Sequence, residues 1–283
     1  MALRDLVAEY NIRFKKSLGQ NLLLDDNINR IMVDAAALTP DDDVVEVGAG
    51  LGALTDRLRR HAGRVLAVEI DRAFMPCLEH RFGEAENVTL FRGDILNHEV
   101  EDLVQEHLPS PRTLKLVSNL PYYITSPILF QFWESPIFFE RMVVMVQAEV
   151  GERLVAAVNS ADYGRLTLAA QYYADVDIVH HVPRTCFTPR PNVDSCIVRL
   201  RSHAGPRFPD IDRSFLMAII AAGFSQRRKT LRNTLIRSGV LGIPTAAAES
   251  VFEELRIDPG RRPQTVTLDE FAAIARTAAA KRT

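Results

Sequence analysis

Residues 46–55 combine glycines with an acidic residue where an apolar run meets a helical pattern. The segment reads Glu-Val-Gly-Ala-Gly-Leu-Gly-Ala-Leu-Thr. Glycines in such a turn let a ligand approach the backbone closely, and N–H groups at the start of the next helix point at that ligand. We therefore expect a nucleotide-like cofactor against Gly48 and Gly50, with Glu46 near any cationic part of it.

The glycine turn by itself leaves two cofactors open. Gly48, Gly50 and Ala53 also satisfy the GxGxxA pattern of dinucleotide-binding turns. Glu69 follows about 20 residues on, where a ribose-binding acid would stand. An NAD-dependent oxidoreductase is therefore one interpretation of this segment. Glu46 favours a different ligand, because a carboxylate before the turn suits an ammonium group and would repel a pyrophosphate.

Two more polar residues follow apolar runs that we expect to be neighbouring strands. Asp94 stands in Gly-Asp-Ile-Leu, where its carboxylate can accept a hydrogen bond from the exocyclic amine of adenine. Asn119 ends the next run. The carboxyl ends of central parallel strands line one crevice, so both residues should meet Glu46 and Glu69 there. Together they fit S-adenosylmethionine, an adenine nucleoside with a cationic amino-acid tail, better than a dinucleotide.

The segment Asn119-Leu-Pro-Tyr122 has chemistry suited to an aromatic amine. The exocyclic amine of a base is a poor nucleophile, because its lone pair is delocalised into the ring. The side-chain oxygen of Asn119 and the carbonyl of Leu120 can both accept from the amine, which favours the geometry that methyl transfer requires. Pro121 fixes the turn, and Tyr122 offers a ring face for stacking. We expect these residues to hold a target adenine.

The elements that must position these residues follow a βαβ pattern. From residue 43 short β-branched runs alternate with amphipathic stretches, which is typical of a parallel sheet. The expected strands are 43–48, 64–70, 88–93, 114–119, 142–147, 175–182 and 194–201. Helices are expected between them at 52–61, 72–82 and 126–133. A proline-rich segment too short for a crossover helix joins the last two strands, so one of them should be antiparallel.

We therefore expect an α/β protein with a Rossmann-like, seven-stranded domain over residues 1–204 and a small all-α domain over residues 205–283. Residues 203–210 have the composition of a linker, and the spacing beyond it predicts helices over 213–237 and 244–255. The first part carries 21 Lys+Arg against 28 Asp+Glu, whereas the second carries 13 against 8. A basic C-terminal part permits an anionic partner such as RNA.

Composition excludes several classes of protein. The chain has 283 residues, of which 47% are hydrophobic and 25% are charged, as in soluble globular proteins. No apolar run approaches the roughly 20 residues that span a bilayer, and the N-terminus has no leader pattern, so we expect a cytoplasmic protein with no membrane partner. The three cysteines lie far apart and the histidines form no HExxH, so we expect no metal site.

The sequence resembles the KsgA family, the small-subunit ribosomal RNA adenine N6,N6-dimethyltransferases, over nearly the whole chain. The matching motifs lie at 19–23, 46–55, 67–71, 93–96, 119–122, 149–154, 163–166, 187–195 and 224–231. The resemblance implies S-adenosylmethionine as cofactor and dimethylation of the N6 atoms of two adjacent adenosines near the 3′ end of small-subunit (16S) rRNA. It also implies a role in ribosome biogenesis, in which a monomer acts on rRNA in an immature 30S particle.

The resemblance also implies roles for individual residues. Asn21 and Leu23 would close over the cofactor, Glu69 would hold its ribose, and Tyr122 and Phe187 would sandwich the target base. The set expected at the cofactor is Asn21, Leu23, Glu46, Gly48, Gly50, Glu69, Ile70, Asp94, Ile95 and Asn119. The set expected at the target adenine is Asn119, Leu120, Pro121, Tyr122 and Phe187. The set expected at RNA phosphates is the basic cluster Arg227, Arg228, Lys229 and Arg232.

The sequence departs from the family pattern at three positions, and other interpretations of its function remain open. Leu22, Ala49 and Ala148 stand where the family usually has phenylalanine, proline and lysine. Methylases of large-subunit rRNA and mitochondrial transcription factors share the resemblance, although the form of the glycine turn and the segment 224–231 favour the small-subunit enzyme. Two rivals come from other classes, namely the NAD-dependent oxidoreductase and a non-catalytic RNA-binding assembly factor. The intact segment 119–122 argues against the second.

Overall fold

The computed structural model describes residues 3–15, 19–226 and 228–282, and the chain forms two compact units. The first unit comprises Met1–Gly151 and Val176–Ala204, and the second comprises Glu152–Asp175 and Gly205–Thr283. The sequence predicted a single boundary at residue 204. In the structure the chain passes from the first unit to the second after Ala204, and residues 152–175 also belong to the second unit.

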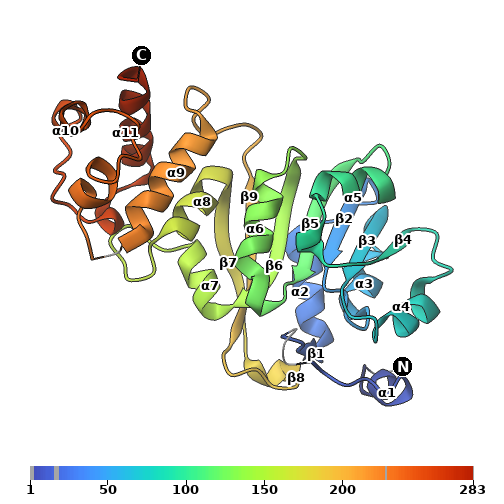
Figure 1. Ribbon diagram of the computed structural model, residues 1–283. Coiled ribbons are helices and arrows are strands. Elements are labelled where there is room, and N and C mark those ends of the chain that lie inside the picture. The colour runs from blue at the N-terminus through green and yellow to red at the C-terminus, as the bar shows by residue number, and fades with distance from the viewer. Residues whose placement is uncertain (1–2, 16–18, 227, 283) are drawn as a thin grey trace. The chain divides into compact units, whose positions relative to one another are not determined.

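The first unit is built on a sheet whose seven strands, within the described residues, run in the order β4-β3-β2-β5-β6-β9-β7 (Figure 1). They are β2 (Asp42–Val47), β3 (Arg64–Glu69), β4 (Val88–Arg92), β5 (Thr113–Asn119), β6 (Phe139–Gln147), β7 (Ala174–Val182) and β9 (Ser195–Ser202). The pairs β2–β3, β2–β5, β3–β4 and β5–β6 are parallel, whereas β9 is antiparallel to β6. The seven-stranded Rossmann-like sheet expected from the sequence is therefore confirmed.

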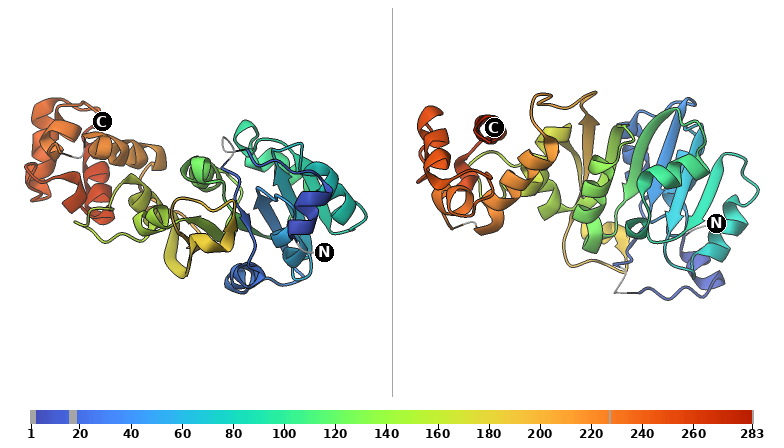
Figure 2. Two further views of the ribbon diagram at one scale, coloured as in Figure 1. Left: turned by 90° about the horizontal axis from the view of Figure 1, so that it is seen from below. Right: turned by 45° about the horizontal axis from the view of Figure 1, so that its top comes forward.

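Helices cover both faces of this sheet. They include α2 (Asp26–Ala36), α3 (Ala53–Leu58), α4 (Met75–Phe82), α5 (Val100–His107) and α6 (Thr125–Glu134). Figure 2 shows α2 on one face and α6 on the other. Strands covered on both sides need no polar alternation, and every residue of β2 is buried. This explains why residues 65–68 in the middle of β3 are a continuous apolar segment, and why even the acidic residues of β2 are buried.

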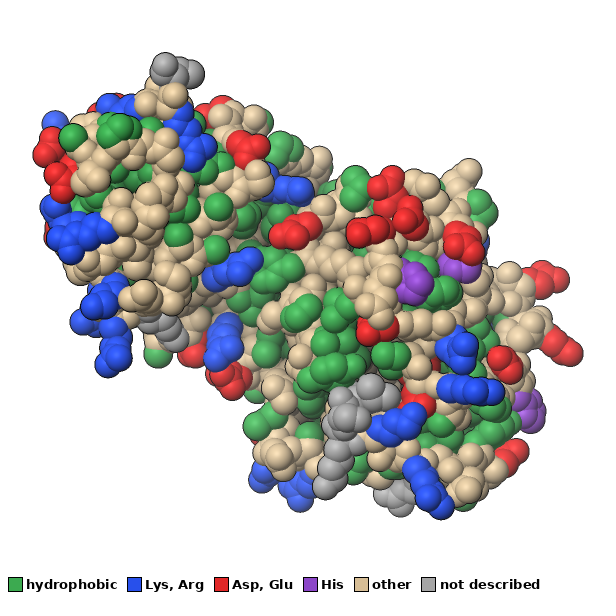
Figure 3. Space-filling view, viewed as in Figure 1, with side chains coloured by type: hydrophobic (Ala, Val, Ile, Leu, Met, Phe, Trp, Pro, Cys, Tyr) green, Lys and Arg blue, Asp and Glu red, His purple; other side chains and the backbone are tan. Residues whose placement is uncertain are grey.

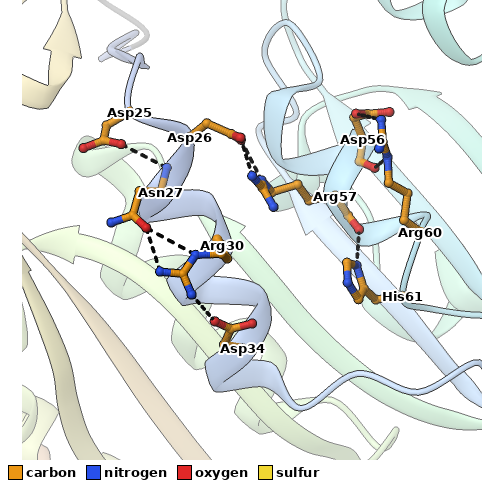
Figure 4. Close-up of polar contacts among 9 residues, drawn as sticks. All are labelled: Asp25, Asp26, Asn27, Arg30, Asp34, Asp56, Arg57, Arg60 and His61. Carbon is orange, nitrogen blue, oxygen red and sulfur yellow. Dashed lines mark hydrogen bonds and ion pairs between the residues drawn. The ribbon is translucent and has the colours of Figure 1, made fainter.

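The helix that follows the glycine turn is fixed against its neighbour α2. Asp25 caps α2 by accepting from the backbone N–H of Asn27 at 2.9 Å. Arg57 of α3 donates to both carboxylate oxygens of Asp26 at the start of α2 (Figure 4). Behind these contacts, Leu58 is buried in the same core as the apolar face of α2. The turn therefore leads into a helix whose position is set by packing and by ion pairing.

The N-terminal segment makes a contact with a distant part of the chain that the sequence did not predict. After α1 (Leu3–Glu9), the short strand β1 (Leu22–Leu23) pairs antiparallel with β8 (Phe187–Thr188). The backbone N–H of Leu24 extends the pair by donating to the carbonyl of Cys186 at 2.8 Å. The segment that carries Phe187 is thus joined to the start of the chain.

The second unit is a cluster of helices around its own core. It contains α8 (Arg165–Tyr173), α9 (Arg213–Gly223), α10 (Thr245–Glu254) and α11 (Leu268–Ala280), and α7 (Ala148–Leu154) leads into it. Leu168 is buried in one core with Ile219 and Phe271, and the Tyr163 hydroxyl donates to the carbonyl of Val266 at 2.9 Å. These contacts explain why residues 152–175 belong to this unit. No described helix of either unit is long and apolar enough to cross a membrane.

The single helix predicted over 213–237 is wrong in its second half. The helix α9 ends at Gly223, and the described backbone from there to residue 237 forms short helical turns at Phe224–Gln226 and Arg232–Ile236. The backbone N–H of Leu231 leaves the helical pattern to donate to the carbonyl of Arg261 at 2.9 Å. Leu231 and Leu235 are nevertheless fully buried. The spacing of the apolar residues therefore predicted correctly that Leu231 and Leu235 are buried, but it predicted the wrong backbone conformation for this segment.

Candidate functional site

A cavity opens in the first unit at the carboxyl ends of β2, β3, β4 and β5. It encloses about 1000 Å³, including the solvent at its mouth. The walls are the glycine turn after β2, the residues that follow β3 and β4, the turn after β5, and residues 19–23 of the N-terminal segment. This is the crevice in which sheets of this type bind ligands.

Nearly all of the residues expected at the cofactor and the target base line this one cavity. Of the residues expected at the cofactor, the lining includes Asn21, Leu23, Glu46, Gly48, Gly50, Glu69, Ile70, Asp94 and Ile95. Of those expected at the target base, it includes Asn119, Leu120, Pro121 and Tyr122. The strand ends that were expected to meet therefore line one cavity.

Glu69 ties the glycine turn to the end of β3. Its side chain is buried and accepts from the backbone N–H of Gly50 and from that of Asp71, each at 2.7 Å. Gly48 and Gly50 have φ values of +81° and +58°, in the left-handed region that favours glycine. Burial raises the pKa of Glu69 above its usual value, although the two N–H donors oppose that shift. The carboxylate thus shapes the turn and lines the cavity at once.

Glu46 lies deeper, at the end of β2. Only 1% of it is exposed, and Thr55 in α3 donates to its Oε2 atom at 2.6 Å. Burial, with a smaller contribution from the nearby charge of Glu69, raises the pKa of Glu46 to about 8. A cationic group in the cavity would favour the ionised carboxylate and lower this pKa.

Glu46 should make the stability of the ligand-free protein depend on pH. The unfolded chain releases this proton near pH 4.5 and the folded protein near pH 8, so the folded state holds the extra proton between these values. The free energy of unfolding should fall as pH rises through that window, by at most about 1.4 kcal/mol per pH unit. Glu46→Gln keeps an oxygen for Thr55 and should remove this part of the pH dependence. Urea unfolding of both proteins across the window checks the difference, and parallel curves would contradict it.

The turn after β5 places both Asn119 and Tyr122 in the cavity wall. Asn119 ends β5, and the backbone N–H of Leu120 donates to the carbonyl of Met145 on the neighbouring β6 at 3.1 Å. The Tyr122 hydroxyl and the buried Ser195 hydroxyl lie 2.6 Å apart in a hydrogen bond. Because the hydroxyl is held at its far end, the Tyr122 ring has a fixed orientation at the cavity wall. This is the arrangement expected of a surface on which a base stacks.

Asp94 lies just beyond the end of β4 and lines the cavity. Its Oδ1 atom accepts from the backbone N–H of Leu96 at 3.0 Å and so caps a short helical turn at Ile95–Asn97. A carboxylate has acceptor capacity for further donors, including an exocyclic amine. The position of Asp94 is therefore set by the backbone next to it and does not depend on a ligand.

Two of the expected groups are not among the residues that line the cavity. Phe187 does not line it: only 3% of this residue is exposed, and it packs in a core with Leu23 and Ile197. The reason is the β1–β8 pairing, which sets Phe187 opposite Leu23. The basic cluster lies in the second unit, where Arg228 and Lys229 are exposed.

The members of the basic cluster differ in their surroundings. Arg232 forms an ion pair with Glu249, so part of its charge is already neutralised. Arg227 lies outside the described residues. On the face shown in Figure 3, lysine and arginine side chains gather along the lower left edge of the second unit. Among the described residues, no group of three His, Cys, Asp or Glu side chains could hold a metal ion.

Sequence reasoning left out of its predicted sets three polar side chains that line the cavity, namely those of Gln20, Asn29 and Tyr123. Tyr123 is 50% exposed and lies next to Gly19. A Cβ atom added at Gly19 would be 3.4 Å from the Tyr123 ring. Asn29 is buried in α2 and occupies the same helix face as its apolar neighbours. A polar residue at a core-facing position was a signal that could have found Asn29.

The family model of ribosomal RNA adenine dimethylases matches residues 11–275 of the chain. The chain belongs to this family. A ribosomal RNA small subunit methyltransferase A from Bacillus cytotoxicus is 41% identical over 273 residues, which cover 96% of this chain and 93% of the relative. The protein of the same name from Bacillus mycoides has the same identity and coverage.

Two solved structures resemble the dimethylase. A dimethyladenosine transferase from Plasmodium falciparum has a TM-score of 0.77 at 26% identity, over 89% of this chain and 95% of its own. The 23S rRNA methyltransferase ErmE has a TM-score of 0.63 at 25% identity, over 95% of this chain and 99% of its own. The fold of this dimethylase is therefore that of known rRNA methyltransferases.

Proposed function

We propose that this dimethylase uses S-adenosylmethionine to methylate the N6 atoms of two adjacent adenosines near the 3′ end of small-subunit (16S) rRNA. The observation that carries the proposal is that the Asn119–Tyr122 turn lines the same cavity as Glu69 and Asp94. The relatives with 41% identity are named for the small subunit, whereas ErmE, named for 23S rRNA, is 25% identical. This difference supports a small-subunit substrate.

The residues present suit S-adenosylmethionine. When bound, this cofactor supplies a methyl group activated by its sulfonium charge. Glu69 is placed to accept from ribose hydroxyls and Asp94 from the adenine amine, while the buried Glu46 suits a cationic tail. A dinucleotide would instead bring its pyrophosphate to the turn beside Glu46, where like charges repel.

The chain's own part in the transfer lies in the turn after β5. The side-chain oxygen of Asn119 and the carbonyl of Leu120 accept from the target N6 amine, which draws its lone pair out of conjugation with the ring. Tyr122 supplies the stacking face and holds the base in line with the donor. The target adenine must be single-stranded or flipped out, because N6 is occupied by pairing in a helix.

The proposal extends to the partner and the compartment. The substrate is rRNA within an immature 30S particle, and the enzyme acts as a monomer in the cytoplasm. Exposed Arg228 and Lys229 contact phosphates of that particle, which positions the enzyme without reading sequence. The ion pair with Glu249 makes Arg232 the weaker contact of the cluster.

The experiment that tests the proposed function is a methyl-transfer assay on immature 30S particles that lack the modification. We expect mass spectrometry to find N6,N6-dimethyladenosine in the 3′-terminal hairpin of 16S rRNA and none in 23S rRNA offered in parallel. Titration with S-adenosylhomocysteine should show saturable binding, and titration with NADH should show none. Methylation of 23S rRNA alone would support the large-subunit alternative. Particle binding without methyl transfer would support a non-catalytic assembly factor.

Replacing Arg228 and Lys229 together with alanine should weaken binding to the 30S particle in a salt-dependent way. Each lost phosphate contact should flatten the slope of log affinity against log salt by about 0.7–0.9. Affinity for S-adenosylhomocysteine should stay the same and serves as the control for folding. Filter binding at several salt concentrations measures the slope. A slope equal to that of the wild type would show that these side chains do not contact RNA.

A further inference from the structure

Asp71 joins the cavity wall to the N-terminal part of the chain. It lies two residues beyond Glu69, and its side chain is completely buried. Lys15 Nζ donates to Oδ1 of Asp71 and Gln20 Nε2 donates to Oδ2, each at 2.7 Å. The backbone N–H of Lys15 also donates to Gln20 Oε1 at 2.7 Å, so the three residues form a closed ring of hydrogen bonds. Residues 16–18 between the two donors lie outside the described part of the chain.

The segment held by this ring belongs to the cavity. We call residues 19–24 the N-terminal strap; its residues 19–23 line the cavity directly. On its far side the strap pairs with β8, which places Leu23 opposite Phe187. The strap therefore lies between the cavity and the segment that carries the second predicted base-stacking ring.

Capping of the turn that follows β3 explains only one of the contacts that Asp71 makes. Its Oδ1 atom also accepts from the backbone N–H of Ala73 at 3.0 Å, as a turn-capping aspartate does. That role needs neither Lys15 nor Gln20. Burial acts to raise the pKa of Asp71, but the hydrogen bond from Lys15 and the other donors outweigh it, so the pKa is lowered and the side chain is ionised. A buried carboxylate of this kind depends on its partners, which here come from the strap side.

We propose that Asp71 is a positioning residue for methyl transfer, which anchors the N-terminal strap over the cofactor cavity and, through the β1–β8 pair, sets the place of Phe187. This inference rests on the proposed function. Asp71 touches neither cofactor nor base in this scheme. It acts through the strap, so it should influence cofactor affinity and RNA recognition together.

The test is a set of variants measured by calorimetry with S-adenosylhomocysteine. Asp71→Asn keeps an oxygen for Ala73 but loses the charge that holds Lys15, and it should weaken binding about tenfold. Lys15→Ala should weaken binding roughly threefold, because this side chain is half exposed. The double variant should bind no more weakly than Asp71→Asn alone, since both changes remove the same contact. Arg72→Ala removes an exposed charge from the same loop and is the matched control, with unchanged affinity.

A second readout separates positioning from a general loss of structure. Asp71→Asn should raise KM for the 30S particle while kcat stays within about twofold, because Asn119 and its turn are untouched. Equal affinities for Asp71→Asn and the wild type, or equal losses in Arg72→Ala, would overturn the inference. If Asp71→Asn does not fold, Gln20→Leu breaks the ring from the strap side, and an unchanged affinity there would overturn it as well. A wild-type protein that fails to bind S-adenosylhomocysteine would instead refute the proposed function.

Discussion

Replacing Asn119 with alanine should reduce the rate of methyl transfer about 10²-fold, which corresponds to roughly 3 kcal/mol of lost transition-state stabilisation. Asn119 ends β5 and lines the cavity on the side of the turn that holds Tyr122. Asn119 is expected in both the cofactor set and the target set, but its amide oxygen is assigned to the target amine and not to the sulfonium group of the cofactor. Affinity for S-adenosylhomocysteine should therefore be nearly unchanged. Single-turnover methylation of 30S particles measures the rate, and calorimetry measures the affinity.

The matched variant is Asn119→Asp, which has the same shape and keeps an acceptor oxygen at the same place. We expect it to retain more activity than Asn119→Ala, because acceptance from the amine is the property that matters. If Asn119→Ala lost cofactor binding together with activity, Asn119 would have to be reassigned to the cofactor site. Thermal unfolding of both variants shows whether the β5 end has kept its structure.

Replacing Glu69 with alanine should produce the opposite pattern. Affinity for S-adenosylhomocysteine should fall by about 1.5–3 kcal/mol, the range for hydrogen bonds to a charged group. The structure adds a second reason for the loss, because Glu69 also holds the backbone N–H groups of Gly50 and Asp71. Removing the carboxylate therefore loses the contact with the ligand and also releases the backbone of the glycine turn. Calorimetry at constant pH and salt measures the change.

Glu69→Gln separates these two contributions. Its amide oxygen can still accept from one of the two backbone N–H groups, so the turn is partly kept while the charge is lost. We expect an affinity between those of the wild type and Glu69→Ala. Unchanged affinity in both variants would mean that the end of β3 does not face the ribose. A protein that loses its cooperative unfolding transition in Glu69→Ala would show that the turn contacts dominate.

Features that depend on local sequence were predicted well. The seven strands were found within a few residues, because buried parallel strands form continuous β-branched runs. Glu46, Glu69, Asp94 and Asn119 were correctly brought to one edge, since strand direction alone fixes which ends meet. The choice of these four residues followed from the strand topology, whereas Asn21 and Leu23 entered the cofactor set only through the family resemblance.

Features that depend on distant pairing could not be predicted. Nothing near Phe187 in the sequence shows that Leu23 will lie opposite it and bury its ring. The break after Gly223 was hidden for the same reason, because the partner of the Leu231 N–H is the carbonyl of Arg261. The high pKa of Glu46 follows from its burial, which the glycine motif did not reveal.

The strand order β6-β9-β7 has a consequence for how the protein is made on the ribosome. Among the described residues β9 is the only neighbour of β7 in the sheet, yet β9 is synthesised later. Likewise, Leu168 belongs to a core that is completed only when α11 has been made. The ribosome adds about 5–20 residues per second, so apolar side chains within residues 152–182 remain without their partners for several seconds. The nascent chain is therefore exposed to chaperones late in synthesis. A chain cut at residue 204 would still contain β9 to pair with β7, but the apolar surface of residues 152–175 would lack its partners permanently.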